Sequence, residues 1–241
     1  MGCKCISYLL EKSRVVRQTL GERNFHVFYM LLVGAESSLI DEYKLKKPSA
    51  FNFLNQSGCM EIDGRNDKEE FEMLMEAFQH VGFSPSHQRQ ILQCLAGILH
   101  LGNVQFSDVP QTEEVVNPIS GLKETKTKED ESTRGAVTRA TQKDLQLAAR
   151  MLEMMDLADM SEVGASHLEH ALCYVTVKGA ANTNTGQAEV VQMPLSALQA
   201  ANNRDALAKA CYDKLFDKIV AQVNRSLFKG RDEGWNIGVL G

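Results

Sequence analysis

The sequence has no apolar run close to the ~20 residues that a membrane-spanning helix requires. It also lacks an excess of positive charge. With a formal net charge of -5, its overall field would not recruit nucleic acid or an anionic membrane surface. Its six cysteines are scattered without metal-ligand spacing. We interpret them as the reduced thiols of a cytoplasmic protein. We expect no nucleic-acid partner and no membrane span.

Recognisable catalytic and metal-binding motifs are missing as well. No G-x-x-x-x-G-K-[ST] phosphate loop is present, and the superficially similar Gly179–Gly186 lacks the lysine, which favours a hairpin tip. His167 and His170 lack the i, i+4 spacing that places two metal ligands on one helical face. No nucleophile elbow surrounds a serine. His26 and His100 lie within apolar helical patterns and are expected at the edge of the core. From the residues alone we assign no catalytic, metal-binding or cofactor-binding residue.

A long helical pattern near the end of the chain is the main feature that the sequence does contain. Over residues 203–228, apolar side chains recur on one face at about 3.6 residues per turn. Asn202 is the expected N-cap, and Asp205 is placed to close a capping box. The apolar segment 235–240 follows without in–out alternation, as is typical of a strand covered on both faces of a sheet.

Shorter helices account for most of the remaining pattern. They are expected over 22–33 with Gly34 as the capping residue, over 38–45, from Asp67 to Gly82, over 85–102 with Ser84 as the N-cap, from Thr141 and from Ser166. The segment 49–64 is expected to be irregular, with Phe51, Phe53 and Leu54 as its buried anchors. The expected capping-box pairs are Asp67 with Glu70, Thr141 with Asp144, and Ser166 with Glu169. Short strands are expected at 6–10 and 104–106. With 44% apolar and 24% charged residues, the sequence predicts a soluble, mainly α chain with short β elements.

Two segments are predicted to project from this helical body. Residues 107–140 are rich in Glu, Lys, Thr and Asp, which favours a solvated surface loop or flexible insertion. The β-rich runs 173–177 and 189–193 flank a tip rich in Gly, Asn and Thr, which is typical of a β-hairpin. Pro194 is expected to end its second strand.

Several motifs, in this order and spacing, resemble the motor head of myosins. They are Leu9–Val16 (LLEKSRVV), Gly21–Tyr29 (GERNFHVFY), Phe51–Cys59 (FNFLNQSGC), Leu95–Asn103 (LAGILHLGN), Arg204–Lys209 (RDALAK) and Ile237–Leu240 (IGVL). The resemblance covers the chain apart from the loop at 107–140. It implies residues 1–241 of a partial motor domain: a fragment of an α/β, P-loop NTPase-like fold, with a long central helix and strands from the central sheet.

The resemblance also implies what this chain does not carry. In myosins the phosphate loop and the first nucleotide switch precede the strand at Ile6. The second switch begins where this chain has Gly241 in place of the family's Asp. The intact motor is therefore expected to bind ATP and Mg²⁺. The fragment alone is expected to bind neither and to be inactive as an ATPase.

What remains resembles the upper actin-binding subdomain. The hairpin at 174–196 matches a myosin loop that presses on actin, and counting back 16 positions from Asp205 gives Glu189, where the family keeps an acidic or phosphorylatable residue. Glu supplies a permanent negative charge there. The resemblance makes Lys178, Glu189, Val190 and Gln192 the candidate actin-binding residues. The loop at 107–140, with Lys123, Lys126 and Lys128 among carboxylates, occupies the place of a second surface loop that can approach actin.

Two functional hypotheses follow from the resemblance. In the first, the chain is part of an actin-based motor ATPase, with F-actin and the remainder of the heavy chain as partners in the cytoplasmic actin cytoskeleton. In the alternative, it is a truncated, non-enzymatic myosin-like protein with at most weak actin binding. A phosphate loop upstream and an Ile-x-Gly-Phe-Glu sequence downstream would favour the first hypothesis, and stop codons would favour the second.

Overall fold

The computed structural model of the chain describes residues 5, 10–110, 112–116, 123–127, 133–152, 165–181 and 188–227, with only the backbone described for 112–116, 123–127, 178–181 and 188–189. The strand predicted at 235–240 lies outside these residues, as does the strand predicted at 6–10 apart from Leu10. The structure therefore does not describe the expected strands of the central sheet.

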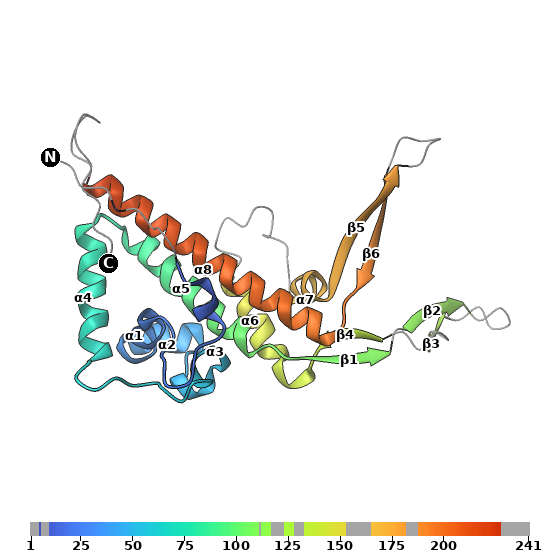
Figure 1. The fold of residues 1–241 in the computed structure, drawn as a ribbon, viewed down its shortest axis with the longest axis horizontal. Helices are drawn as coiled ribbons and strands as arrows, with labels where there is room; N and C mark the ends of the chain where they lie inside the picture. Colours follow the sequence, from blue (N-terminus) through green and yellow to red (C-terminus); the bar gives the residue numbers. More distant parts are fainter. Residues whose placement is uncertain are drawn as a thin grey trace.

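The described part of the chain is mainly helical, with short antiparallel strands, as the sequence predicts. In chain order its elements are η1 (Lys12–Val15), α1 (His26–Gly34), α2 (Ser37–Tyr43), η2 (Pro48–Ala50), α3 (Asn52–Asn55), α4 (Asp67–His80), α5 (Pro85–Asn103), β1 (Phe106–Pro110), β2 (Thr112–Val116), β3 (Lys123–Thr127), β4 (Thr133–Val137), η3 (Arg139–Thr141), α6 (Gln142–Leu152), α7 (Ala165–Cys173), β5 (Tyr174–Ala181), β6 (Ala188–Pro194) and α8 (Ala197–Leu227). Helices form a body on one side, and the strands extend from it (Figure 1). Within the described residues, no helix combines the length and apolar character needed to cross a membrane.

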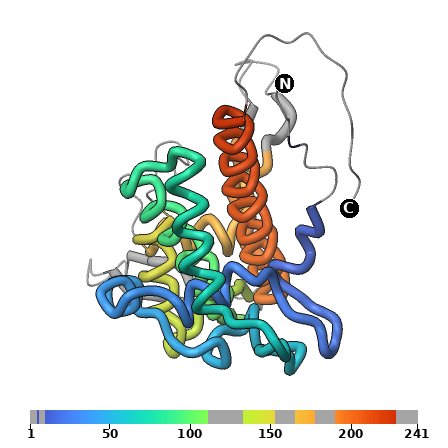
Figure 2. Tube along the Cα trace, turned by 90° about the vertical axis from the view of Figure 1, so that its left-hand side faces the viewer, coloured from blue at the N-terminus to red at the C-terminus, as the bar shows by residue number. Residues whose placement is uncertain are grey.

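The long helix α8 runs along the helical body beside α5 (Figures 1 and 2). It begins at Ala197, so the start predicted at Asn203 is wrong by six residues. The capping box is formed by Ser196 and Gln199 in place of Asn202 and Asp205. Ser196 Oγ accepts from the Gln199 N–H at 3.3 Å, and Gln199 Oε1 accepts from the Ser196 N–H at 2.9 Å. Glutamine closes such a box as well as glutamate does. This capping box was missed in the sequence because apolar residues flank the glutamine.

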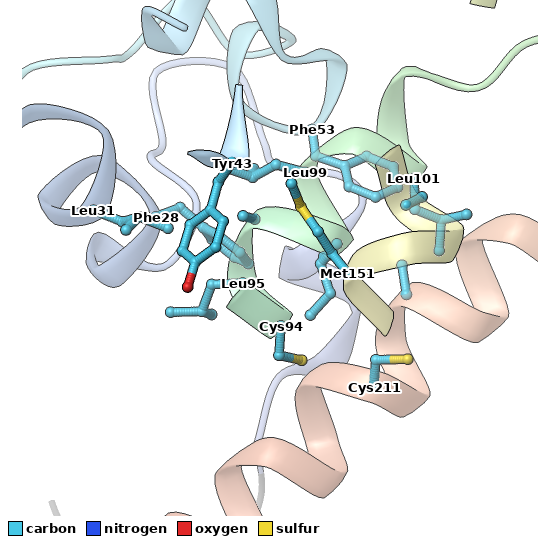
Figure 3. Packing of buried hydrophobic residues seen from close by; sticks show 14 of the residues in the cluster. Phe28, Leu31, Tyr43, Phe53, Cys94, Leu95, Leu99, Leu101, Met151 and Cys211 are labelled. Atoms are coloured by element: carbon cyan, nitrogen blue, oxygen red, sulfur yellow. The ribbon is translucent and has the colours of Figure 1, made fainter. Parts of the chain in front are cut away.

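Helix α5 is the centre of the core and packs against α3, α6 and α8 (Figure 3). Its predicted N-cap is confirmed, because Ser84 Oγ accepts from the His87 N–H at 3.3 Å. Close approach to its neighbours depends on glycine. A Cβ on Gly102 would lie 2.5 Å from the Phe53 ring, and one on Gly97 would lie 3.0 Å from Leu152. The predicted anchor Phe53 is thus seated directly on the backbone of α5.

Helix α1 begins at His26, four residues after its predicted start at Glu22. Asn24 explains the delay, because its buried amide Nδ2 donates to the carbonyls of Val15 and Phe53, both at 2.9 Å. These bonds hold the chain before α1 in a non-helical path. Gly34 is a helical residue and not the predicted capping glycine. A Cβ there would meet Phe71 of α4 at 2.4 Å.

The start of helix α4 also differs from the prediction. Asn66 is the N-cap, and its side chain accepts from the backbone N–H groups of Lys68 and Glu69. Asp67 instead forms a buried ion pair with Arg23, and Glu70 pairs with Arg65. Asn is among the best N-cap residues, so the two carboxylates are free for side-chain ion pairs. The predicted helix end is confirmed, since Gly82 follows with φ +87°.

Two other acidic residues expected in capping boxes make tertiary contacts. Asp144 Oδ1 of α6 lies 3.2 Å from His100 Nδ1 and 3.4 Å from Asn103 Nδ2. Glu169 of α7 accepts from the backbone N–H of Val137 at 2.9 Å. His100 was expected at the core edge but is fully buried, with Nε2 2.8 Å from the Tyr43 carbonyl oxygen. These carboxylates join separate elements.

The segment predicted as a solvated surface loop or flexible insertion, 107–140, contains strands β1 to β4 in the part of it that the structure describes. Strand β1 pairs antiparallel with β4, and β2 pairs antiparallel with β3. The strand predicted at 104–106 lies further along the chain, at Phe106–Pro110. Thr and Val in these segments suit extended backbone, but the charged residues between them masked the pattern.

Candidate functional site

The β5–β6 hairpin leaves the helical body between α7 and α8 and projects away from it (Figure 1). Its strands are antiparallel, from Tyr174 opposite Pro194 to Lys178 opposite Val190, with an irregular register before Ala181. The strand ranges agree with the β-rich runs in the sequence. Pro194 is the last residue of β6. Proline has no N–H to donate to the ladder, so it is tolerated at the end of the strand.

One face of this hairpin is apolar and exposed. Val175 lies opposite Met193, and Val177 lies opposite Val191. Residues two apart on a strand share a face, so the four side chains form one patch, here named the apolar face. Their exposed fractions are 41% for Val175, 42% for Val177, 45% for Val191 and 51% for Met193. A two-stranded ribbon without a covering layer cannot bury them.

The predicted actin-binding residues lie on the same two strands. Lys178 and Val190 are brought together as one cross-strand pair, and Val190 is 59% exposed. Gln192 lies opposite Thr176, and its Oε1 is 3.0 Å from His170 Nε2. Glu189 lies in β6, where the structure describes its backbone. Three of the four predicted positions thus lie within the four residues 189–192 of β6, and Lys178 lies across from them on β5.

The base of the hairpin is fixed by polar and aromatic contacts. The His170 ring stacks on Tyr174 with 4.3 Å between ring centroids. Asn203 Nδ2 donates to the Leu172 carbonyl at 3.2 Å, which ties α8 to the end of α7. The Leu195 N–H donates to the Cys173 carbonyl at 2.8 Å. The hairpin is therefore anchored at its base, and it is exposed over residues 175–177 and 190–193.

The described residues contain no cluster of three or more His, Cys, Asp or Glu side chains that could hold a metal ion. Buried thiols offer no nucleophile either, because burial raises the pKa of Cys173 and of Cys211 to about 11, and that of Cys94 further. Burial, followed by the charges of Arg65 and Arg23, lowers the pKa of His26.

Comparison with known proteins identifies the family. The model of the Myosin head (motor domain) family matches residues 1–241. The chain belongs to the myosin head family. The matched range includes the hairpin and the strands at 106–137.

Individual myosins align along the whole chain. The Myosin ID heavy chain of Dictyostelium discoideum is 35% identical over 240 residues, covering 99% of this chain and 19% of that relative. The Myosin heavy chain IB of Acanthamoeba castellanii is 35% identical over 243 residues, covering 99% and 17%. Unconventional myosin-Ia of Mus musculus is 35% identical over 242 residues, covering 100% and 20%. The chain thus spans about a fifth of the length of these myosins.

Sequence reasoning identified the hairpin but missed its apolar face. The signal was present in the alternation of Val175 and Val177 around a threonine, and of Val191 and Met193 around a glutamine. Alternation predicts one apolar face per strand. Only the cross-strand register brings the two half-faces onto the same side of the ladder.

Proposed function

We propose that this chain supplies the filament-contacting part of an actin-based myosin motor, with F-actin as the partner of the β5–β6 hairpin. The observation that carries the proposal is the apolar face, in which Val175, Val177, Val191 and Met193 remain 41–51% exposed on an unsupported ribbon. Apolar patches of this kind on a soluble protein mark interaction surfaces. The family membership supports actin as the partner.

The physical gain from docking this face is substantial. Removing apolar surface from water stabilises a complex by roughly 25 cal/mol per Å². Burying two or three branched side chains would therefore supply several kcal/mol before the entropic cost of association. Val190 and Gln192 alternate with Val191 and Met193 along β6 and so lie on the opposite face of the ladder. We assign Lys178, Glu189, Val190 and Gln192 to register and encounter with the filament, and the apolar face to affinity. Charged residues act there more on association rate and specificity than on the fold.

The alternative function is a truncated, non-enzymatic myosin-like protein that binds actin weakly. Under the first proposal, ATP and Mg²⁺ belong to the intact motor and are held by residues outside this chain. The discriminating observation is the transcript flanking this sequence. A reading frame that continues upstream into a phosphate loop favours the motor, and stop codons on both sides of this sequence favour the alternative.

The charge at Glu189 provides a test of the proposed interface. In a complete motor head, Glu189→Lys changes the local charge by two units and Glu189→Gln changes it by one. Both should alter actin-activated ATPase, Lys more than Gln, and the effect should shrink as salt rises because exposed charges are screened over roughly 8–10 Å. Glu189→Asp is the matched control and should remain close to the parent. Identical rates for Glu189→Lys and parent at low and moderate salt would exclude the assigned role.

The nucleotide part of the proposal has its own experiment. The purified 241-residue chain should release no phosphate from ATP, with or without filaments, because it carries no phosphate cradle. The complete head, measured in parallel, is the positive control. Saturable, filament-stimulated phosphate release by the 241-residue chain would overturn this assignment.

A further inference from the structure

A single rung of the β1–β4 ladder holds the linker that joins the hairpin to the long helix. Asp108 on β1 and Gly135 on β4 are directly opposite each other. The Gly135 N–H donates to the Leu195 carbonyl at 2.6 Å. On the other strand, Asp108 Oδ1 accepts from the Ala197 N–H at 2.7 Å. The rung therefore grips both sides of the short segment between β6 and α8.

The Asp108 contact is an N-terminal cap supplied from another element. Ala197 is the first residue of α8, and its N–H has no partner within the helix. A carboxylate at this position also faces the positive end of the helix dipole. Ser196 and Gln199 already form the local capping box. Asp108 thus adds a bond that depends on the placement of the whole β1–β4 ladder.

Gly135 allows the ladder to approach this closely. A Cβ built on Gly135 would lie 2.9 Å from the Ala197 nitrogen, 2.9 Å from the Ser196 carbonyl carbon and 3.0 Å from Ala197 Cα. These neighbours are backbone atoms, which cannot turn aside as a flexible side chain would. Any larger residue must therefore push the ladder away from the linker.

We infer that this clamp rung, Asp108 opposite Gly135, sets the direction in which the β5–β6 hairpin leaves the helical body. It thereby couples the β1–β4 ladder to the hairpin and to the start of α8. Both are positioning residues, since they act on the hairpin through Leu195 and Ala197. A second link supports the coupling: Glu169 of α7 accepts from the Val137 N–H, two residue pairs along the ladder from the clamp. A force on the β1–β4 ladder or on the β5–β6 hairpin is therefore transmitted to the start of α8.

Hydrogen–deuterium exchange of the 241-residue chain tests the clamp. Asp108→Ala removes the acceptor, and exchange of the Ala197 amide should become about tenfold faster, the loss expected for a hydrogen bond to a charged group. Exchange in β5 and β6 should rise as well, because the hairpin base loosens. Gly135→Ala should produce the same pattern by steric displacement. Asp108→Asn keeps an acceptor oxygen and should change exchange less than Asp108→Ala.

Ser107→Ala is the matched control, an exposed neighbour on the same strand that should leave exchange at the linker unchanged. Amides of α5 should remain at parent rates in every variant, which separates loss of the clamp from general destabilisation. Parent-like exchange at 195–197 in both Asp108→Ala and Gly135→Ala would overturn the inference. An equal rise in α5 and the linker would overturn it too.

A second arm places Asp108→Ala in the complete motor head and measures sedimentation with filaments. This arm rests on the proposed function, whereas the exchange arm does not. We expect severalfold weaker sedimentation, with recovery in Asp108→Asn. Unchanged sedimentation alongside faster exchange would overturn the link between the clamp and the binding surface. If the parent head fails to sediment, the proposed function fails, and the exchange experiment still decides the clamp.

Discussion

The helical body around α5 and the β5–β6 hairpin distribute their side chains in opposite ways. In the body, buried polar groups such as Asn24, His100 and Asn103 are hydrogen-bonded to backbone or carboxylate partners. In the hairpin, Val177 and its apolar neighbours stay exposed to water. Polar groups inside a core fix a unique packing because an unpaired one is costly. Apolar groups left outside are stabilising only when a partner covers them.

The largest expected contrast comes from truncating one side chain in each region. Phe53→Ala should lower the free energy of unfolding by about 3–5 kcal/mol, because it removes a fully packed ring and leaves a cavity beside α5. Val177→Ala should change it by less than about 0.5 kcal/mol, since the side chain is already exposed. Urea titration monitored by circular dichroism measures both. Similar losses for the two variants would contradict the contrast between the helical body and the β5–β6 hairpin.

Adding a methyl group to the body should have the next largest effect. Gly102→Ala places a Cβ 2.5 Å from the Phe53 ring. We expect a loss of about 1–3 kcal/mol in the free energy of unfolding, the usual cost of overpacking. Gly97→Ala is the graded control, because its Cβ would meet the flexible Leu152 side chain at 3.0 Å. Chemical denaturation should show a larger loss for Gly102→Ala than for Gly97→Ala. The reverse order would show that the Phe53 ring can shift to accommodate the added methyl group.

The buried polar network should make the stability of the helical body sensitive to acid, whereas that of the β5–β6 hairpin should not be. Burial alone would raise the pKa of Asp144, but hydrogen bonds from His100 and Asn103, with the charges of His100 and Lys46, lower it below its ordinary value. A depressed carboxyl pKa stabilises the fold above the unfolded pKa of about 4, and this contribution is lost as pH falls through the lower folded pKa. Asp144→Asn should therefore cost about 1.5 kcal/mol at pH 7.

The difference between parent and Asp144→Asn should shrink as the pH is lowered below about 4. Thermal melting from pH 7 to pH 3 follows this difference directly. Asp41→Asn, at an exposed position of α2, is the control and should track the parent throughout. A gap between Asp144→Asn and parent that stays constant over this range would remove the ionised carboxylate from the explanation.

The smallest effect on stability, and the clearest effect on binding, is expected on the apolar face. Val177→Thr and Val191→Thr keep the β-branched shape and should shift the free energy of unfolding by less than about 0.5 kcal/mol each. In a complete motor head, the pair should weaken filament sedimentation severalfold. Thr176→Val, adjacent to Val177 on the strand, is the control for a general change in apolar content. Unchanged binding by the double variant would remove the apolar face from the interface.

Local patterns predicted much of the helical body. The Ser84 cap, the end of α4 at Gly82 and the burial of Phe51, Phe53 and Leu54 all follow from short-range rules, and the structure confirms them. The candidate site was predicted only in part. The hairpin was recognised from its β-rich runs, but the roles of Lys178, Glu189, Val190 and Gln192 stay predictions. Its apolar face depends on cross-strand register, which single-strand patterns do not specify.

The sequence by itself determined the family, the helical content and the absence of a phosphate loop, because these depend on residue identity and short spacing. Tertiary structure alone decided which carboxylates cap helices and which join elements. Asp144, Asp108 and Glu169 have similar chemistry, yet each binds a partner more than 30 residues away. A carboxylate accepts from whichever donor the fold brings within about 3 Å, and that distance is set by packing between elements remote in the chain.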